Sequence, residues 1–376
     1  MDGVGEPVRC DPPFEDHAVF IDLMASTVSQ RRDQYLLINP TFIRKPIPRV
    51  IGGMIDAGDL NAMAFRDRQG IYYVGINAGI FNVINFLFHR LLCSPTVLGW
   101  VEPGTSVDES LVSGLPPLPT NISLLAARYL SHEESRVRLS PIRDEAATMM
   151  SSEAINMVMD HEFRHIMGGH LDYSSSFGAT FAFQEAMRLA DDDERGLTEQ
   201  AIEMDADEYA IREVLMNLLT YHRGNHPSGL DYGKFFEKPE HVIESSLLCI
   251  DTLFALFDMG SFQNVEDWSR LDHPPAHIRR KMIFDRMLEF ISLEPILATV
   301  REPQLEEIKS RVAAITDGIT YPIFGKQPPA ATIVNVEELS NRHIQKIRQK
   351  WSTIAESMSK HRFADMGLDV LRETRL

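Results

Sequence analysis

The sequence predicts a mainly helical α+β fold with one small β-sheet. Two β-prone runs, at residues 61–65 and 71–77, are separated by a polar loop that ends at Gly70, which is the pattern of a β-hairpin. From about residue 122 almost to the end, the pattern is helical and is interrupted by short breaks that contain Gly or Pro. The 376 residues, of which 44% are hydrophobic and 24% charged, suffice for one large or two ordinary folded domains.

Composition excludes several classes of protein. The net charge of −17 argues against a dedicated nucleic-acid-binding protein, because phosphate neutralisation needs clustered Lys and Arg. The three cysteines are widely separated, which indicates reduced thiols rather than a disulfide framework. The N-terminus has no secretory signal, and the two most apolar stretches, residues 79–101 and 242–262, are interrupted by polar or charged residues. We therefore expect a cytoplasmic protein without a membrane-spanning helix.

An HExxH motif spans residues 161–165. The residues before it are compatible with a helix, and the Gly168–Gly169 pair after it is a plausible helix end. The i, i+4 spacing places His161 and His165 on one helix face, so both imidazoles can reach a single Zn²⁺. Glu162 lies about 100° around the helix from His161, where it can deprotonate a zinc-bound water. The competing interpretation is that these side chains belong to a solvated helix face.

A third zinc ligand has two candidates. His170 suggests the longer HExxHxxGxxH pattern, but that pattern needs histidine at position 171, which is Leu171 here. The better candidate is Glu203, which stands at i, i+4 to Asp207 on a second predicted helix. Asp207 can then accept a hydrogen bond from the distal nitrogen of a ligand histidine. Ala206 between them favours close approach of two helices, although an acidic helix face would explain the same residues.

At this point the sequence resembles the gluzincin metallopeptidases of the HtpX and CAAX-prenyl-protease type. The HExxH motif and the later Glu-Met-Asp-Ala-Asp run at 203–207 carry the resemblance. Two further matches are the Asn-Ala-Met-Ala sequence at 61–64 with the run 71–77, and the His-Pro-Pro-x-x-x-Arg element at 273–279. The four elements occur in the family's order and cover roughly residues 60–285. A weaker resemblance is to the Lit phage-exclusion peptidase type, through the HExxH motif and the soluble build.

The resemblance implies a zincin-like catalytic domain at residues 60–285, with a small sheet and an active-site helix. It implies one Zn²⁺ per chain and the following residues: His161, His165 and Glu203 as ligands, Glu162 as base, Asp207 behind a ligand, and His273 and Arg279 near the substrate or the oxyanion. The chain departs from the family in lacking membrane helices and in having Arg164 where Gly is common. Residues from about 286 onward match nothing in the family.

These residues predict a zinc-dependent endopeptidase that acts on a protein or peptide substrate. Glu162 would take a proton from the zinc-bound water and deliver it to the leaving amine. Candidate oxyanion donors are His273, His277, Arg279 and Tyr209, and His273 is preferred on motif position. The strand at 71–77 would lie along the cleft, where an extended peptide could add as another strand.

A peptidase that acts on one host protein in defence or toxicity is a variant of the endopeptidase hypothesis. The alternative is a catalytically silent, metal-bound scaffold or regulatory protein that uses the fold for partner binding.

The flanks divide into an N-terminal lead-in at residues 1–59 and a helical C-terminal appendage at 286–376. A predicted helix at about 336–360 carries several basic residues. We favour the interpretation that they form a solvated helix face; the alternative is a docking surface for an acidic partner. The Pro- and Gly-rich segment 102–120 and the loop 224–240 are expected places for a lid or an inhibitory element.

Overall fold

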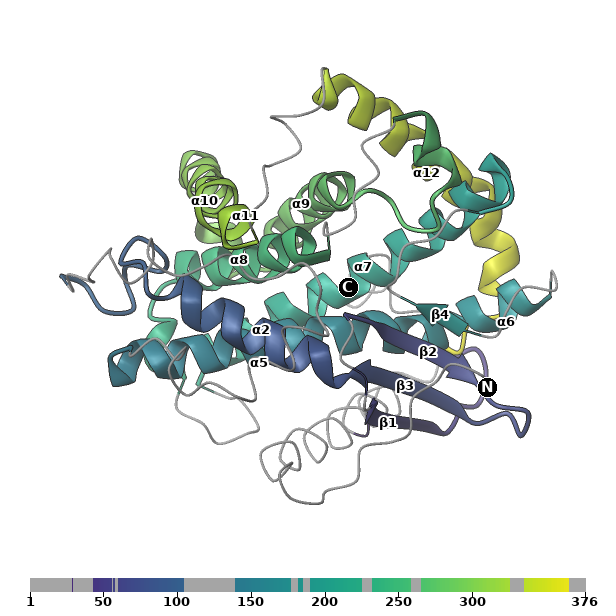
Figure 1. The fold of residues 1–376 in the computed structure, drawn as a ribbon, viewed down its shortest axis with the longest axis horizontal. Helices are drawn as coiled ribbons and strands as arrows, with labels where there is room; N and C mark the ends of the chain where they lie inside the picture. The colour runs from purple at the N-terminus through teal and green to yellow at the C-terminus, as the bar shows by residue number, and fades with distance from the viewer. Residues whose placement is uncertain are drawn as a thin grey trace.

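A computed structural model describes Ser29 and residues 43–55, 57, 60–104, 139–176, 182–184, 190–224, 232–257, 265–324 and 335–364. Helices dominate these residues, and the strands form one small sheet at one side of the molecule (Figure 1). This arrangement confirms the expectation of a mainly helical α+β fold. The predicted lid segment 102–120 lies almost entirely outside the described residues, as do most of the lead-in and His226 of the loop 224–240.

The sheet has four strands in the order β1-β3-β2-β4. Their bounds are Val50–Ile55 for β1, Ala62–Arg66 for β2, Tyr72–Asn77 for β3 and Ala182–Gln184 for β4. β2 and β3 pair antiparallel, with Ala62 opposite Ile76, so the predicted hairpin is confirmed. β1 pairs parallel with β3, and β4 pairs antiparallel with β2. The strand at 71–77 is therefore central in the sheet, and the prediction that a peptide could pair beside it is wrong.

Local hydrogen bonds explain the turn of the hairpin. The Oδ1 atom of Asp67 accepts from the backbone N–H groups of Gln69 and Ile71, at 2.8 and 2.9 Å. Gly70 has a φ of 82°, a left-handed conformation that glycine adopts without steric cost. This turn sets the β2–β3 register.

Two long helices form the centre of the molecule. α5 (Pro141–Met167) packs along α7 (Asp193–His222), α2 (Ala78–Leu91) covers α5, and α8 (Pro239–Phe257) contacts both α5 and α7. α5 also contacts β2 and β3, so it lies between the sheet and α7 (Figure 1). At the junction of α2 and α5, the buried guanidinium of Arg143 donates to the carbonyl oxygens of Leu92, Ser94 and Val97. These contacts hold the segment that follows α2 against the first turn of α5.

The rest of the chain surrounds this centre with shorter helices. Their bounds are α6 His170–Ser175, η3 Gly233–Phe235, η5 Val265–Arg270, α9 Ala276–Leu293, η6 Leu297–Thr299, α10 Glu302–Ile315, the π-helical η7 Thr316–Thr320, α11 Tyr321–Ile323 and α12 Val336–Ser359. α10 packs on α8, and α12 runs across α7 on the outside of the molecule (Figure 1). Residues 285 and 286, where the sequence suggested a division, both lie within α9.

Among the helices of the described residues, none has an apolar stretch long enough to cross a bilayer.

Candidate metal centre

The HExxH residues lie in the last two turns of α5. The helix starts at Ser140, whose Oγ accepts from the backbone N–H of Arg143, and Pro141 occupies its first turn, both of which favour helix initiation. It ends at Gly168, as the sequence predicted. His161, Glu162 and His165 are 3%, 1% and 0% exposed. The motif is therefore part of the protein interior, which excludes the interpretation as a solvated helix face.

α7 supplies the acidic residues of the site. Glu203 and Asp207 stand one turn apart on this helix and are 1% and 2% exposed. Ala206, between them, is fully buried, and α7 packs along α5. The small side chain permits the close approach of the two helices that the sequence suggested.

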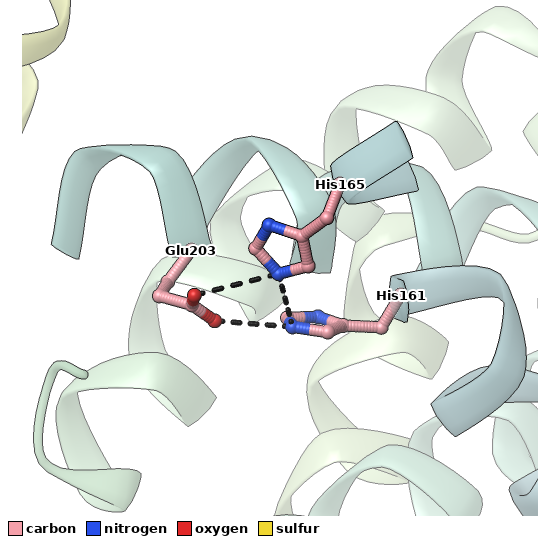
Figure 2. A group of neighbouring side chains, drawn as sticks. All are labelled: His161, His165 and Glu203. Carbon is pink, nitrogen blue, oxygen red and sulfur yellow. Dashed lines mark hydrogen bonds and ion pairs between the residues drawn. The ribbon is translucent and has the colours of Figure 1, made fainter. Parts of the chain in front are cut away.

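Three side chains converge on one point. The Nε2 atom of His161 lies 3.0 Å from Oε2 of Glu203, and the Nε2 atom of His165 lies 3.4 Å from Oε1 of the same carboxylate. The two Nε2 atoms are 3.1 Å apart. Figure 2 shows the carboxylate of Glu203 facing both imidazole rings from the opposite helix. His161, His165 and Glu203 therefore form a buried group that could hold a metal ion.

The separations within this group match tetrahedral coordination. For metal–ligand bonds of about 2.0–2.1 Å, two ligand atoms of a tetrahedral zinc site lie about 3.3 Å apart. The separations of 3.0–3.4 Å are close to that value. Two imidazoles and one carboxylate also suit a zinc site that keeps one coordination position for a further ligand. The residues present thus fit a divalent metal ion.

Asp207 lies behind the first histidine. Its Oδ1 atom is 2.9 Å from Nδ1 of His161, the nitrogen that faces away from Glu203, as the sequence analysis expected. The guanidinium of Arg279 donates to both carboxylate oxygens of Asp207, at 2.6 and 2.8 Å. Burial favours the neutral carboxyl, but the charge of Arg279 and the hydrogen bonds from His161 and Arg279 outweigh it and lower the pKa of Asp207. Asp207 therefore stays ionised and favours a proton on Nδ1 of His161.

His273 contacts the same carboxylate as the two histidines. Its Nε2 atom lies 3.3 Å from Oε2 of Glu203, and its Nδ1 atom lies 2.9 Å from Oδ1 of Asp272. Burial raises the pKa of Glu203, but His273, His165 and His161 together hold that pKa well below its usual range. Glu203 is therefore an anion in the interior, and such a charge is retained only where cationic partners or a metal compensate it.

The structure places the other candidates outside this group. The Nδ1 atom of His170 lies 3.1 Å from Nδ1 of His165, on the side of that ring away from Glu203. Burial lowers the pKa of His170 to about 4, so the ring is neutral near pH 7. His277 lies edge-on to Trp268, and Tyr209 faces the guanidinium groups of Arg164 and Arg212.

Two further acidic residues near the site, Asp205 and Asp272, have no role that the sequence predicts. Asp205 contacts His170 and Arg164, at 3.2 and 2.7 Å, and Asp272 contacts His273. Asp205 was visible only as one more charge on an acidic helix face. Asp272 directly precedes the His-Pro-Pro element, and its position one residue before a histidine was the available signal.

Comparison with known proteins adds no relative: no family model matches the chain, and neither a curated protein nor a solved structure matches it.

Proposed function

We propose that the protein is a zinc-dependent endopeptidase that hydrolyses peptide bonds of a protein substrate. The observation that carries this proposal is the buried convergence of His161, His165 and Glu203, with Glu162 on the same helix as the two histidines. One zinc ion per chain would be held by these three side chains. The similarity of the motifs to gluzincin peptidases supports the same assignment.

The chemistry that zinc supplies in such a site is polarisation of the scissile carbonyl and acidification of a coordinated water. Glu162 then serves as general base and passes the proton to the leaving amine, so that the C–N bond breaks with a neutral amine as product. His273 is the preferred donor to the oxyanion on motif position, and its Nε2 atom lies beside the proposed zinc ligands, 3.3 Å from Oε2 of Glu203. Since Arg279 is engaged by Asp207, we assign it the role of holding Asp207 behind His161.

The first test measures metal content. Purified wild type is expected to contain close to one equivalent of zinc by elemental analysis. Glu203→Ala removes the carboxylate ligand and is expected to lose most of the metal. Glu199→Gln, one turn earlier on α7 and paired with Arg195, is the matched control and should retain it. Wild type without near-stoichiometric metal would refute the proposal.

The second test separates catalysis from metal binding. Glu162→Gln should keep its zinc and reduce peptide cleavage by about 10²–10⁴-fold, because the general base is lost. Glu145→Gln alters an exposed glutamate of the same helix that pairs with Lys234, and it should retain activity. The readout is the set of new protein N-termini that each variant generates in a lysate. Zinc-loaded wild type that produces no cleavage would favour the alternative of a metal-bound scaffold.

A further inference from the structure

We infer that His170 and Asp205 are positioning residues that hold His165 in its metal-binding orientation. The inference rests on the proposed metal site and deepens it. The Nδ1 atom of His170 lies 3.1 Å from Nδ1 of His165, and its Nε2 atom lies 3.2 Å from Oδ2 of Asp205. The two rings meet edge to face, at an interplanar angle of 74°. All three side chains thus form one continuous path from α7 to the second histidine of the motif.

The direction of the hydrogen bonds follows from the position of the metal ligands. His165 turns its Nε2 atom toward Glu203, so metal binding requires that this nitrogen carry no proton. The proton of the neutral ring then resides on Nδ1 and is donated to Nδ1 of His170. His170 must accept there, so its own proton lies on Nε2 and is donated to Asp205. The opposite direction would place a proton on Nε2 of His165, where it blocks the metal.

Asp205 is held in place from two sides. The Nε atom of Arg164, the residue before His165, donates to Oδ2 of Asp205 at 2.7 Å. The guanidinium of Arg362, which follows α12, approaches Oδ1 at 3.9 Å. Arg164 is also the position at which the chain departs from the family pattern. This departure is explained if Arg164 holds Asp205, the acceptor at the end of the path behind His165, in place.

The turn between α5 and α6 places His170 beside His165. Gly169 has a φ of 75°, a left-handed conformation that lets α6 start directly after α5. A Cβ atom on Gly168 would lie 2.6 Å from Nε2 of His170, so the imidazole fills the space that the missing side chain leaves. The Gly-Gly-His sequence thus folds the ring back onto His165.

The two metal-binding histidines are consequently supported in parallel ways. His161 contacts Asp207 directly, whereas His165 reaches Asp205 through His170. Both aspartates come from α7, where they stand two residues apart and follow Glu203 by two and four residues. Fixing the tautomer and rotamer of a ligand in this way typically strengthens metal binding 10–100-fold.

The test compares zinc affinity by competition with a chromophoric chelator. His170→Leu removes both hydrogen bonds at similar volume and is expected to weaken zinc binding 10–100-fold. His170→Asn keeps an acceptor near the Nδ1 position, so it should fall between His170→Leu and wild type. His361→Leu, a nearby histidine that packs edge-on against Tyr173, is the control and should bind like wild type.

Cobalt substitution provides a second readout that a general loss of stability would not produce. The visible absorption of the Co²⁺-loaded protein should change in His170→Leu and less in His170→Asn, because the ligand geometry at His165 relaxes. Equal zinc affinity and equal cobalt absorption in wild type and both variants would overturn the inference and leave the proposed function intact. A wild type that binds neither metal would instead refute the proposed function. If His170→Leu does not fold, identical binding and absorption of His170→Asn and wild type still overturn the inference.

Discussion

At the residue scale, polar neighbours fix the protonation of a buried histidine outside the candidate metal centre. The amide nitrogen of Gln200 donates to the carbonyl oxygens of Trp268 and Leu271, at 2.6 and 2.7 Å. Its Oε1 atom must therefore accept from Nε2 of His343, at 2.7 Å. Burial, together with the nearby Lys346 and His277, lowers the pKa of His343 to about 4. His343 is thus neutral in the folded protein.

This histidine predicts sensitivity to acid. In the unfolded chain it takes up a proton below about pH 6.5, whereas in the fold it stays neutral to about pH 4. The unfolded state therefore binds more protons in this window, and the free energy of unfolding falls as pH decreases through it. By pH 5 the loss from His343 is roughly 2 kcal/mol.

Urea unfolding of metal-free protein at pH 7.5 and pH 5 measures this loss. His343→Gln retains a donor for Gln200 but does not titrate, so it should lose roughly 2 kcal/mol less than wild type between the two pH values. An equal loss in both proteins would show that His343 does not contribute to the acid sensitivity.

The buried group that could hold a metal ion could be predicted at this scale, because the spacing of its residues along two helices is visible in the sequence. The i, i+4 spacing places His161 and His165 on one face of α5. The same spacing places Glu203 and Asp207 on one face of α7. The contacts of His170 could not be predicted in the same way. They depend on the left-handed turn at Gly169 and on how α5 crosses α7, and neither is a local property of the residues concerned.

At the scale of elements, the hairpin was predictable and the outer strands were not. β2 and β3 are adjacent in the sequence and joined by a turn with a recognisable Asp and Gly. β1 contains Gly52 and Gly53, which weaken a strand signal, and it pairs with β3 only through a parallel, non-local register. β4 has three residues, too few for alternation to be visible.

The end of α5 is closed by a distant segment. The backbone N–H of Phe363 donates to the carbonyl oxygen of Met167 at 3.0 Å. A Cβ atom on Gly169 would lie 2.3 Å from the backbone of His361. The segment after α12 therefore packs directly on the turn that follows the HExxH motif, and glycine is required there for space as well as for conformation.

Two alanine substitutions separate these requirements. Gly224→Ala imposes a left-handed conformation without any clash, since a Cβ atom there would meet nothing within 4 Å, and it should cost about 1–2 kcal/mol. Gly169→Ala adds the overlap with His361 and should cost clearly more. Urea unfolding measures both; similar costs would mean that the contact with the C-terminal segment gives way easily.

At the scale of the whole molecule, α12 belongs to the same packed structure as the candidate metal centre. A second apolar cluster joins it to α7, η5 and α9 through Ile202, Trp268 and Ile278, which are all buried. Of the basic residues that suggested an acidic partner, Arg348 pairs with Asp285, Lys350 with Glu194 and Arg342 with Glu338. These contacts within the chain favour the interpretation as an ordinary solvated face, and an acidic partner stays a prediction without support.

This packing predicts that a chain ending at residue 334 does not keep the native fold. α12 contributes four buried side chains to the second cluster, Ile344, Ile347, Ile354 and Met358. Burial of each stabilises by about 1.5–3 kcal/mol, so together they contribute roughly 6–12 kcal/mol. That range is comparable to the whole stability of a typical domain, about 5–15 kcal/mol, and the truncation would also expose Trp268.

Thermal unfolding and the binding of a hydrophobic dye distinguish the outcomes. A chain ending at 364 retains α12 and the hydrogen bond from Phe363 to Met167, and it should unfold at nearly the wild-type temperature. The chain ending at 334 should bind the dye and show no cooperative transition. If it unfolds cooperatively near the wild-type temperature instead, residues 335–376 are a separable appendage, and the path from Arg362 to the metal centre is dispensable for stability.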